Sequence, residues 1–98
     1  MSGLPSGPGG QVPDSAAPYK RTPEFTEETV PAGLLREHST RAGVWGVITV
    51  TSGTLRYVIP STGVDARLDP ETPGIVVPEQ LHYVAPLGSV SFYVEFWR

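Results

Sequence analysis

Apolar and polar residues alternate along several short stretches of this chain, and a period of two residues is typical of β-strands. The clearest example is residues 89–97, where Val90, Phe92, Val94 and Phe96 occupy one face of an expected strand. Polar and amphipathic side chains take the other face. We therefore expect the apolar face of this stretch to be the one that contributes to the core.

A second strand signal surrounds the dipeptide Ser52-Gly53. Residues 44–51 (VWGVITVT) and 54–59 (TLRYVI) are rich in β-branched residues on either side of it. A short turn dipeptide between two such runs predicts a β-hairpin, with Gly53 at a positive φ that only glycine adopts without strain. We expect the two runs to pair with each other.

Shorter stretches separated by proline and glycine complete the predicted strands. They are residues 34–38, 64–68, 75–77 and 81–84. No segment shows a convincing helical period. About seven short strands with frequent turns predict an all-β sandwich or barrel.

The start of the chain differs in composition from the rest. Of its 98 residues, 11 are glycine and 11 are proline, and residues 1–18 hold several of both and no aromatic residue. Such a segment offers little apolar area to offset the entropy of ordering it. We expect residues 1–18 to be a disordered tail and residues 19–98 to be the folded domain.

Charge and cysteine content exclude several classes of function. The formal net charge is −3 and no basic cluster is present, which disfavours nucleic acid and anionic membranes as partners. The absence of cysteine excludes disulfides, thiolate metal sites and a cysteine nucleophile. Apolar stretches are too short to span a bilayer, and a secretory signal is lacking. We expect a cytoplasmic protein.

Two histidines are the main candidates for chemistry. His38 and His82 lie on different expected strands, and a closed barrel can bring such residues to one cavity. Glu95, within an apolar strand, is the best third ligand for a divalent ion. Two histidines and a carboxylate suit iron(II), or zinc with an open position. Alternatively, both histidines are hydrogen-bonded, partly buried residues and Glu95 pairs with an arginine such as Arg36 or Arg56.

Other residues could bind a ligand without a metal. Arg36, on the expected face of His38, could hold an anion by a forked contact. An aromatic pocket, or simply an aromatic core, could form from Trp45, Tyr57, Tyr83, Tyr93 and Trp97. Phosphate-binding and dinucleotide-binding glycine motifs are absent, as is a serine-hydrolase motif.

Several motifs together resemble the TehB/YeaR-like cupin domain family. They are His-x-Thr-x-x-Gly-x-Trp-Gly at residues 38–46, Pro-x-x-x-His at 78–82, Thr-Pro-x-Phe at 22–25 and Pro-Ala-Gly at 31–33. The resemblance covers nearly all of residues 19–97. It implies a small antiparallel β-barrel of jelly-roll type with one open mouth.

The same resemblance implies that His38 and His82 are the recurring histidines of the family, and that a carboxylate matching Glu95 belongs to the closing strand. Thr40 and Gly46 stand where cupins in general carry a second histidine and a glutamate. In two-module TehB proteins, methyl transfer belongs to a separate C-terminal domain. We therefore expect this chain to lack its own methyltransferase activity.

Three hypotheses follow. The first is a metal-binding cupin module that holds zinc or iron and is linked to tellurite, other oxyanion or nitrosative stress. The second is an iron(II)-dependent cupin enzyme, an oxygenase or an isomerase. The third is a metal-free barrel that binds a small ligand. In each case the expected partner is a small molecule or oxyanion, and a homodimer is possible.

Overall fold

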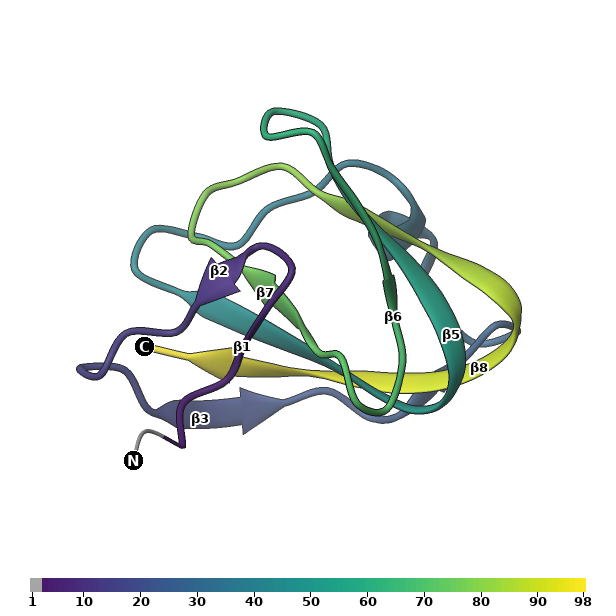
Figure 1. Cartoon of the computed structure of the whole chain (residues 1–98), viewed down its shortest axis with the longest axis horizontal. Coiled ribbons are helices and arrows are strands. Elements are labelled where there is room, and N and C mark those ends of the chain that lie inside the picture. The colour runs from purple at the N-terminus through teal and green to yellow at the C-terminus, as the bar shows by residue number, and fades with distance from the viewer. Residues whose placement is uncertain (1–2) are drawn as a thin grey trace.

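Two long strands form the centre of the structure, a computed structural model that describes residues 3–98 (Figure 1). They are β5 (Trp45–Ile59) and β8 (Tyr83–Trp97). The strands are antiparallel and pair from Trp45 with Trp97 at one end to Val58 with Tyr83 at the other. Both strands bend midway, and this curvature lets one pair of strands enclose a core.

The predicted hairpin around Ser52-Gly53 is wrong. Residues 45–50 and 54–59 belong to the single strand β5, and both pair with β8 instead of with each other. Register shifts between Val50 and Ser52 and between Gly53 and Leu55 mark a bulge at this point. Gly53 does have the predicted positive φ, +79°. The glycine signal therefore marks the bend of a continuous strand.

Shorter strands extend this sheet on both sides. The strand order is β3-β8-β5-β6, β4 also pairs with β8, and β7 pairs with β5. Their bounds are β3 Pro18–Arg21, β4 Phe25–Thr26, β6 Val64–Leu68 and β7 Gly74–Val76. All the pairings are antiparallel. The predicted all-β class is confirmed.

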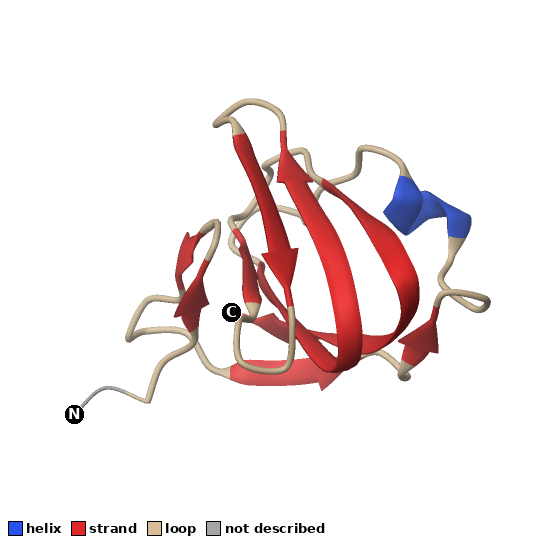
Figure 2. Cartoon of the chain, turned by 45° about the vertical axis from the view of Figure 1, so that its right-hand side comes forward, coloured by secondary structure: helices blue, strands red, loops and turns tan. Residues whose placement is uncertain are grey.

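Helical structure is limited in the described part of the chain to one short 3₁₀ helix, η1 (Ala32–Leu35), coloured blue in Figure 2. It replaces the strand predicted over residues 34–38. Only His38 of that stretch makes a β-bridge. Pro31 precedes the helix, and Arg36 returns to an extended conformation after it, so the chain turns once before it reaches His38.

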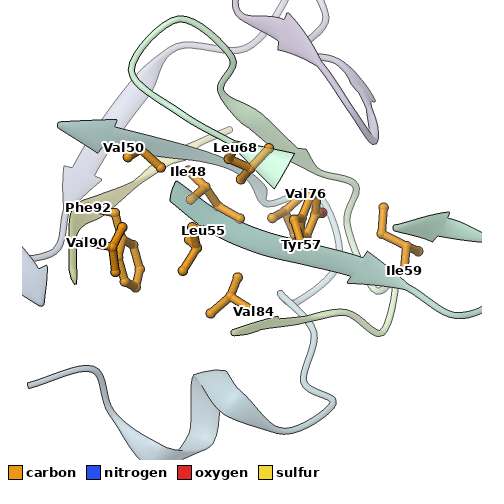
Figure 3. Close-up of a cluster of buried hydrophobic side chains, with 10 residues drawn as sticks. All are labelled: Ile48, Val50, Leu55, Tyr57, Ile59, Leu68, Val76, Val84, Val90 and Phe92. Atoms are coloured by element: carbon orange, nitrogen blue, oxygen red, sulfur yellow. The ribbon is translucent and has the colours of Figure 1, made fainter. Parts of the chain in front are cut away.

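The main core lies between the two halves of the bent strands (Figure 3). Leu55 and Tyr57 on β5 pack with Val90 and Phe92 on β8, and all four are buried. The predicted apolar face of residues 89–97 is confirmed at Val90 and Phe92. The full cluster comprises Ile48, Val50, Leu55, Tyr57, Ile59, Leu68, Val76, Val84, Val90 and Phe92.

Residues 3–18 do not form the disordered tail that their composition suggested. A small hairpin of β1 (Ser6–Gly7) and β2 (Gly10–Gln11) lies against β7, and the Ile75 amide donates a hydrogen bond to the Pro8 carbonyl at 2.9 Å. Val12, directly after the hairpin, is fully buried and packs with Ile75. The expectation failed because glycine lets the segment approach closely: a Cβ on Gly9 would lie 2.0 Å from the Ile75 carbonyl oxygen.

The remaining part of that predicted tail, residues 1–2, lies outside the described residues. Within residues 3–98, no helix is long and apolar enough to cross a membrane.

Candidate functional site

The two histidines of the chain lie side by side. His38 and His82 form an isolated antiparallel bridge in which each backbone amide donates to the other carbonyl, at 3.0 and 2.9 Å. Their ring centroids are 4.1 Å apart. The bridge joins the segment after η1 to the segment before β8, so backbone pairing alone holds the two imidazoles together.

Each imidazole is oriented by a carbonyl two residues earlier. The Nδ1 atom of His38 lies 2.9 Å from the Arg36 carbonyl oxygen, and Nδ1 of His82 lies 2.9 Å from that of Gln80. A carbonyl can only accept, so this arrangement favours the tautomer with the proton on Nδ1. Neither Nε2 atom has a hydrogen-bond partner in the described part of the chain, so Nε2 is the nitrogen available to a ligand.

His82 is the more buried of the pair. Only 3% of its surface is exposed, and its ring makes a T-shaped contact with the Tyr57 ring, with centroids 5.8 Å apart. Burial lowers the pKa of His82 below its usual 6.5, and the neighbouring His38 adds to this shift. The hydrogen bond to Gln80 opposes it. At neutral pH His82 is therefore an uncharged imidazole with an acceptor at Nε2.

Both histidines line a cavity of about 670 Å³. Its apolar walls come mainly from β8 and from the segment that runs from β4 to η1, with further residues from β5, from β7 and from the turn before β5. These residues are Phe25, Pro31, Leu34, Val44, Ile48, Val76, Val84, Phe92, Val94 and Phe96. The volume and the apolar character match those of sites that take a small organic molecule.

Charged residues occur on the lining with one sign only. Lys20, Arg41 and Arg98 contribute to it, whereas no aspartate or glutamate among residues 3–98 does. Lys20 pairs with Phe96 at the end of β8, and Arg98 follows that strand. Arg41 begins the turn that leads into β5. All three are exposed overall, so they lie where the cavity meets solvent.

Glu95 is not part of this site. It follows Val94, which lines the cavity, so its side chain leaves the opposite face of β8, where it contributes to a smaller hollow of about 220 Å³. There the Trp97 indole N–H donates to Oε1 of Glu95 at 2.9 Å. Neither arginine suggested as its partner pairs with it: Arg56 forms an ion pair with Asp65 at 2.7 Å.

His38, His82 and Glu95 are the donor set expected for a zinc or iron ion. His38 and His82 present two Nε2 atoms with the Nδ1 bonding typical of metal ligands. A catalytic zinc takes three protein ligands, and the iron(II) triad needs a carboxylate. No group of three or more possible ligands exists within the described residues. The set of His38, His82 and Glu95 therefore does not fit either centre.

The other sequence candidates lie mostly outside the cavity. Arg36 is exposed, and its carbonyl serves His38, but it does not line the cavity. None of the five suggested aromatic residues lines it either; the aromatic lining is Tyr19, Phe25, Phe92 and Phe96. Sequence reasoning missed Lys20, Arg41 and Arg98. Arg41 alone had a usable signal, because it lies inside the motif that begins at His38.

The burial of His82 predicts a pH-dependent stability. Because the pKa of His82 is lowered in the folded state, the unfolded chain binds more protons as the pH falls through about 6.5. Stability due to this residue is therefore present at higher pH and is lost below that value. We expect urea denaturation to show a smaller decrease in stability from about pH 7.5 to 5.5 for His82→Asn than for wild type. An equal decrease in both would contradict this prediction.

Comparisons with known proteins agree with this architecture. The TehB-like domain family matches residues 20–94. The crystal structure of TehB from Haemophilus influenzae superposes with a TM-score of 0.77 at 26% identity, over 86% of this chain and 32% of that one. A structure of a protein from E. coli strain K12 has a TM-score of 0.78 at 20% identity, over 90% of this chain and 95% of that one.

The search of curated proteins gave no match. This chain spans about a third of the length of the H. influenzae protein. The match to the family extends from β3 into β8 and includes both histidines and most of the cavity lining. The chain therefore belongs to the TehB-like domain family.

Proposed function

We propose that this domain is a binding module of cupin type, a small jelly-roll barrel whose cavity takes one small organic ligand. The observation that carries the proposal is the cavity of about 670 Å³, in which two adjacent imidazoles lie among mainly apolar residues. Many apolar groups with a few convergent polar ones are typical of ligand sites.

The histidines would fix the orientation of the ligand. Each Nδ1 is engaged by a backbone carbonyl, which leaves Nε2 as an acceptor for an O–H or N–H group. A hydrogen-bond donor on the ligand would pair with an Nε2 atom that has no partner among the described residues. The ligand we propose therefore combines an apolar body with at least one hydrogen-bond donor.

A link to oxyanion stress, which the resemblance to TehB proteins suggests, would make this module the ligand-recognition part of a larger process. The proposal includes no methyl transfer by this domain. The superposition covers 32% of the H. influenzae TehB chain, so the proposal concerns the binding module and not the activity of the whole protein.

A divalent metal at the two histidines is the second candidate. The Nδ1 bonds favour it, because metal-bound histidines usually donate their other ring N–H to a carbonyl or carboxylate. Two protein ligands leave the remaining positions to water or to the organic ligand. The three cationic residues on the same lining oppose a resident cation.

NMR spectroscopy with phenol as a probe tests the main proposal. Phenol has an apolar ring and one O–H donor. We expect saturable shifts of the His38 and His82 ring signals and of backbone amides on the cavity lining. A Val94→Trp variant fills the cavity and should abolish the shifts. The matched control is Tyr93→Trp, which adds a tryptophan at the neighbouring position of β8, outside the lining.

Ser39→Trp is a second blocking variant, because Ser39 is exposed and lines the cavity, so its effect on folding should be small. Shifts that persist in both blocking variants, or no shifts in the wild type, would refute the binding module. A parallel titration with Zn²⁺ after treatment with EDTA distinguishes the second candidate. Stoichiometric Zn²⁺ that His38→Ala and His82→Ala both lose would establish the metal site instead.

A further inference from the structure

We infer that the ligand of the cavity is an organic anion, with its acidic group at the end lined by Lys20, Arg41 and Arg98. This inference rests on the proposed function and adds the chemical class of the ligand. The structure supports it through the distribution of charge on the lining, the convergence of three chain segments and the hydrogen bonds of the two histidine rings.

The distribution of charge on the lining is the opposite of that of the chain. The protein has ten acidic and seven basic residues and a net charge of −3. Three of the seven basic residues line the cavity, and within the described part of the chain none of the acidic residues does. The lining is therefore cationic in an acidic protein. Such a local potential attracts anions and disfavours cations.

The three basic residues reach one end of the sheet from separate parts of the sequence. Lys20 lies on β3 opposite Phe96, Arg98 follows the pair of Trp97 with Trp45, and Arg41 starts the turn before β5. All of these positions flank the point where β5 begins and β8 ends. The cavity therefore has a cationic end, formed by residues 20, 41 and 98.

These cations are not neutralised by carboxylates in the structure. The one ion pair among residues 3–98 joins Arg56 on β5 to Asp65 on β6, and neither residue lines the cavity. The Arg98 guanidinium stacks on the Tyr19 ring, 4.0 Å from its centroid, which holds it in place while its N–H groups remain available. An incoming carboxylate thus meets positive charge that has no competing partner.

The histidines determine where the acidic group lies. Nδ1 of each ring lies 2.9 Å from a backbone carbonyl oxygen, so Nε2 is the nitrogen that offers an acceptor to the ligand. A carboxylate at Nε2 would place two acceptors together. The anionic group consequently fits the cationic end, and the apolar body extends along Val94 and Phe92.

Benzoate and benzamide have nearly the same shape, but only benzoate is negatively charged and only benzamide has an N–H donor for Nε2. A preference for benzoate can therefore come only from its charge. We expect benzoate to bind at least about fivefold more tightly than benzamide at low ionic strength, where exposed cations are least screened. The measurement is an NMR titration at neutral pH that follows the amides on the cavity lining. Added sodium chloride should reduce the preference.

Substitutions of the basic residues test whether the preference for benzoate over benzamide comes from the cationic end. Lys20→Gln and Arg41→Gln should each reduce the ratio of the two affinities by at least about twofold, and together they should remove most of it. The control, Arg67→Gln, removes the same charge from exposed β6, outside the lining, and should leave the ratio unchanged.

Two kinds of failure are distinguishable. If benzoate and benzamide bind the cavity equally well, the anion inference is wrong and the binding module stands. If the preference survives loss of both Lys20 and Arg41, or falls equally with Arg67→Gln, the cationic end is not its source and the inference is again wrong. If phenol shifts the lining but neither probe does, the anion inference is wrong and the binding module stands; if phenol itself fails, the proposed function is refuted.

Discussion

Gly53→Ala should lower the free energy of unfolding by about 3 kcal/mol, a large loss for a domain of this size. Gly53 has φ +79°, where an L side chain is strained, and it lies at the bulge that bends β5. A Cβ there would lie 2.1 Å from the Ser89 carbonyl oxygen. Because that oxygen belongs to the backbone of β8, relief requires the two central strands to move apart.

Gly88→Ala is the matched control, and urea denaturation is the measurement. Gly88 has a similar φ of +83° and lies at the bend of β8, but nothing surrounds the position of its missing Cβ. We expect a loss of only about 1 kcal/mol there, the cost of the backbone conformation alone. Equal losses at the two sites would show that close packing of β5 on β8 contributes nothing at Gly53.

Removal of residues 1–16 should lower the free energy of unfolding by about 2–4 kcal/mol. The deletion removes the fully buried Val12 and exposes Val47 and Ile75, with which it packs. It also removes the hydrogen bond from the Ile75 amide to the Pro8 carbonyl. The entropy gained by freeing the segment offsets part of this loss.

Two further variants distinguish the loss of the β1–β2 hairpin and Val12 from the effect of a shorter chain alone. Deletion of residues 1–3 leaves β1, β2 and Val12 in place and should be neutral. Val12→Ala in the full chain should account for about 1–2 kcal/mol of the loss. A chain lacking residues 1–16 that unfolds at the wild-type urea concentration would restore the expectation of a dispensable tail.

The strand pattern predicted which faces are buried better than it predicted which strands pair. Alternation placed Val90 and Phe92 in the core, because burial depends on the local period of side chains. Pairing depends on distant segments. Ser52-Gly53 carries the same local signal at a bulge as in a tight turn, and β8, far along the sequence, determines which of the two forms.

At the candidate site, too, local features were predictable from the sequence and the long-range arrangement was not. His38 and His82 were identifiable by residue type and motif, and the structure brings them together through a backbone bridge. Glu95 was proposed as a ligand because it is a carboxylate, although the alternation of its strand placed it on the face opposite Val94. The structure follows the alternation, so Glu95 lies outside the cavity. Lys20 and Arg98 could not be found from the sequence, since neither belongs to a motif that distinguishes it from a surface residue, whereas Arg41 at least lies inside the motif that begins at His38.

The pairing of β5 with β8 along their full length also affects how quickly the domain can fold. Every pair in this ladder joins residues far apart in the sequence, so none of the ladder forms from local contacts. The loop between Val58 and Tyr83 is the shortest that this pairing closes, and the loop between Trp45 and Trp97 is the longest. Loop-closure entropy therefore favours a transition state in which pairing has begun at the Val58 end. Pairing would then extend along the two strands past the bend at Gly53. The histidine bridge, next to Tyr83, would then form early, and the cationic end of the cavity would form last.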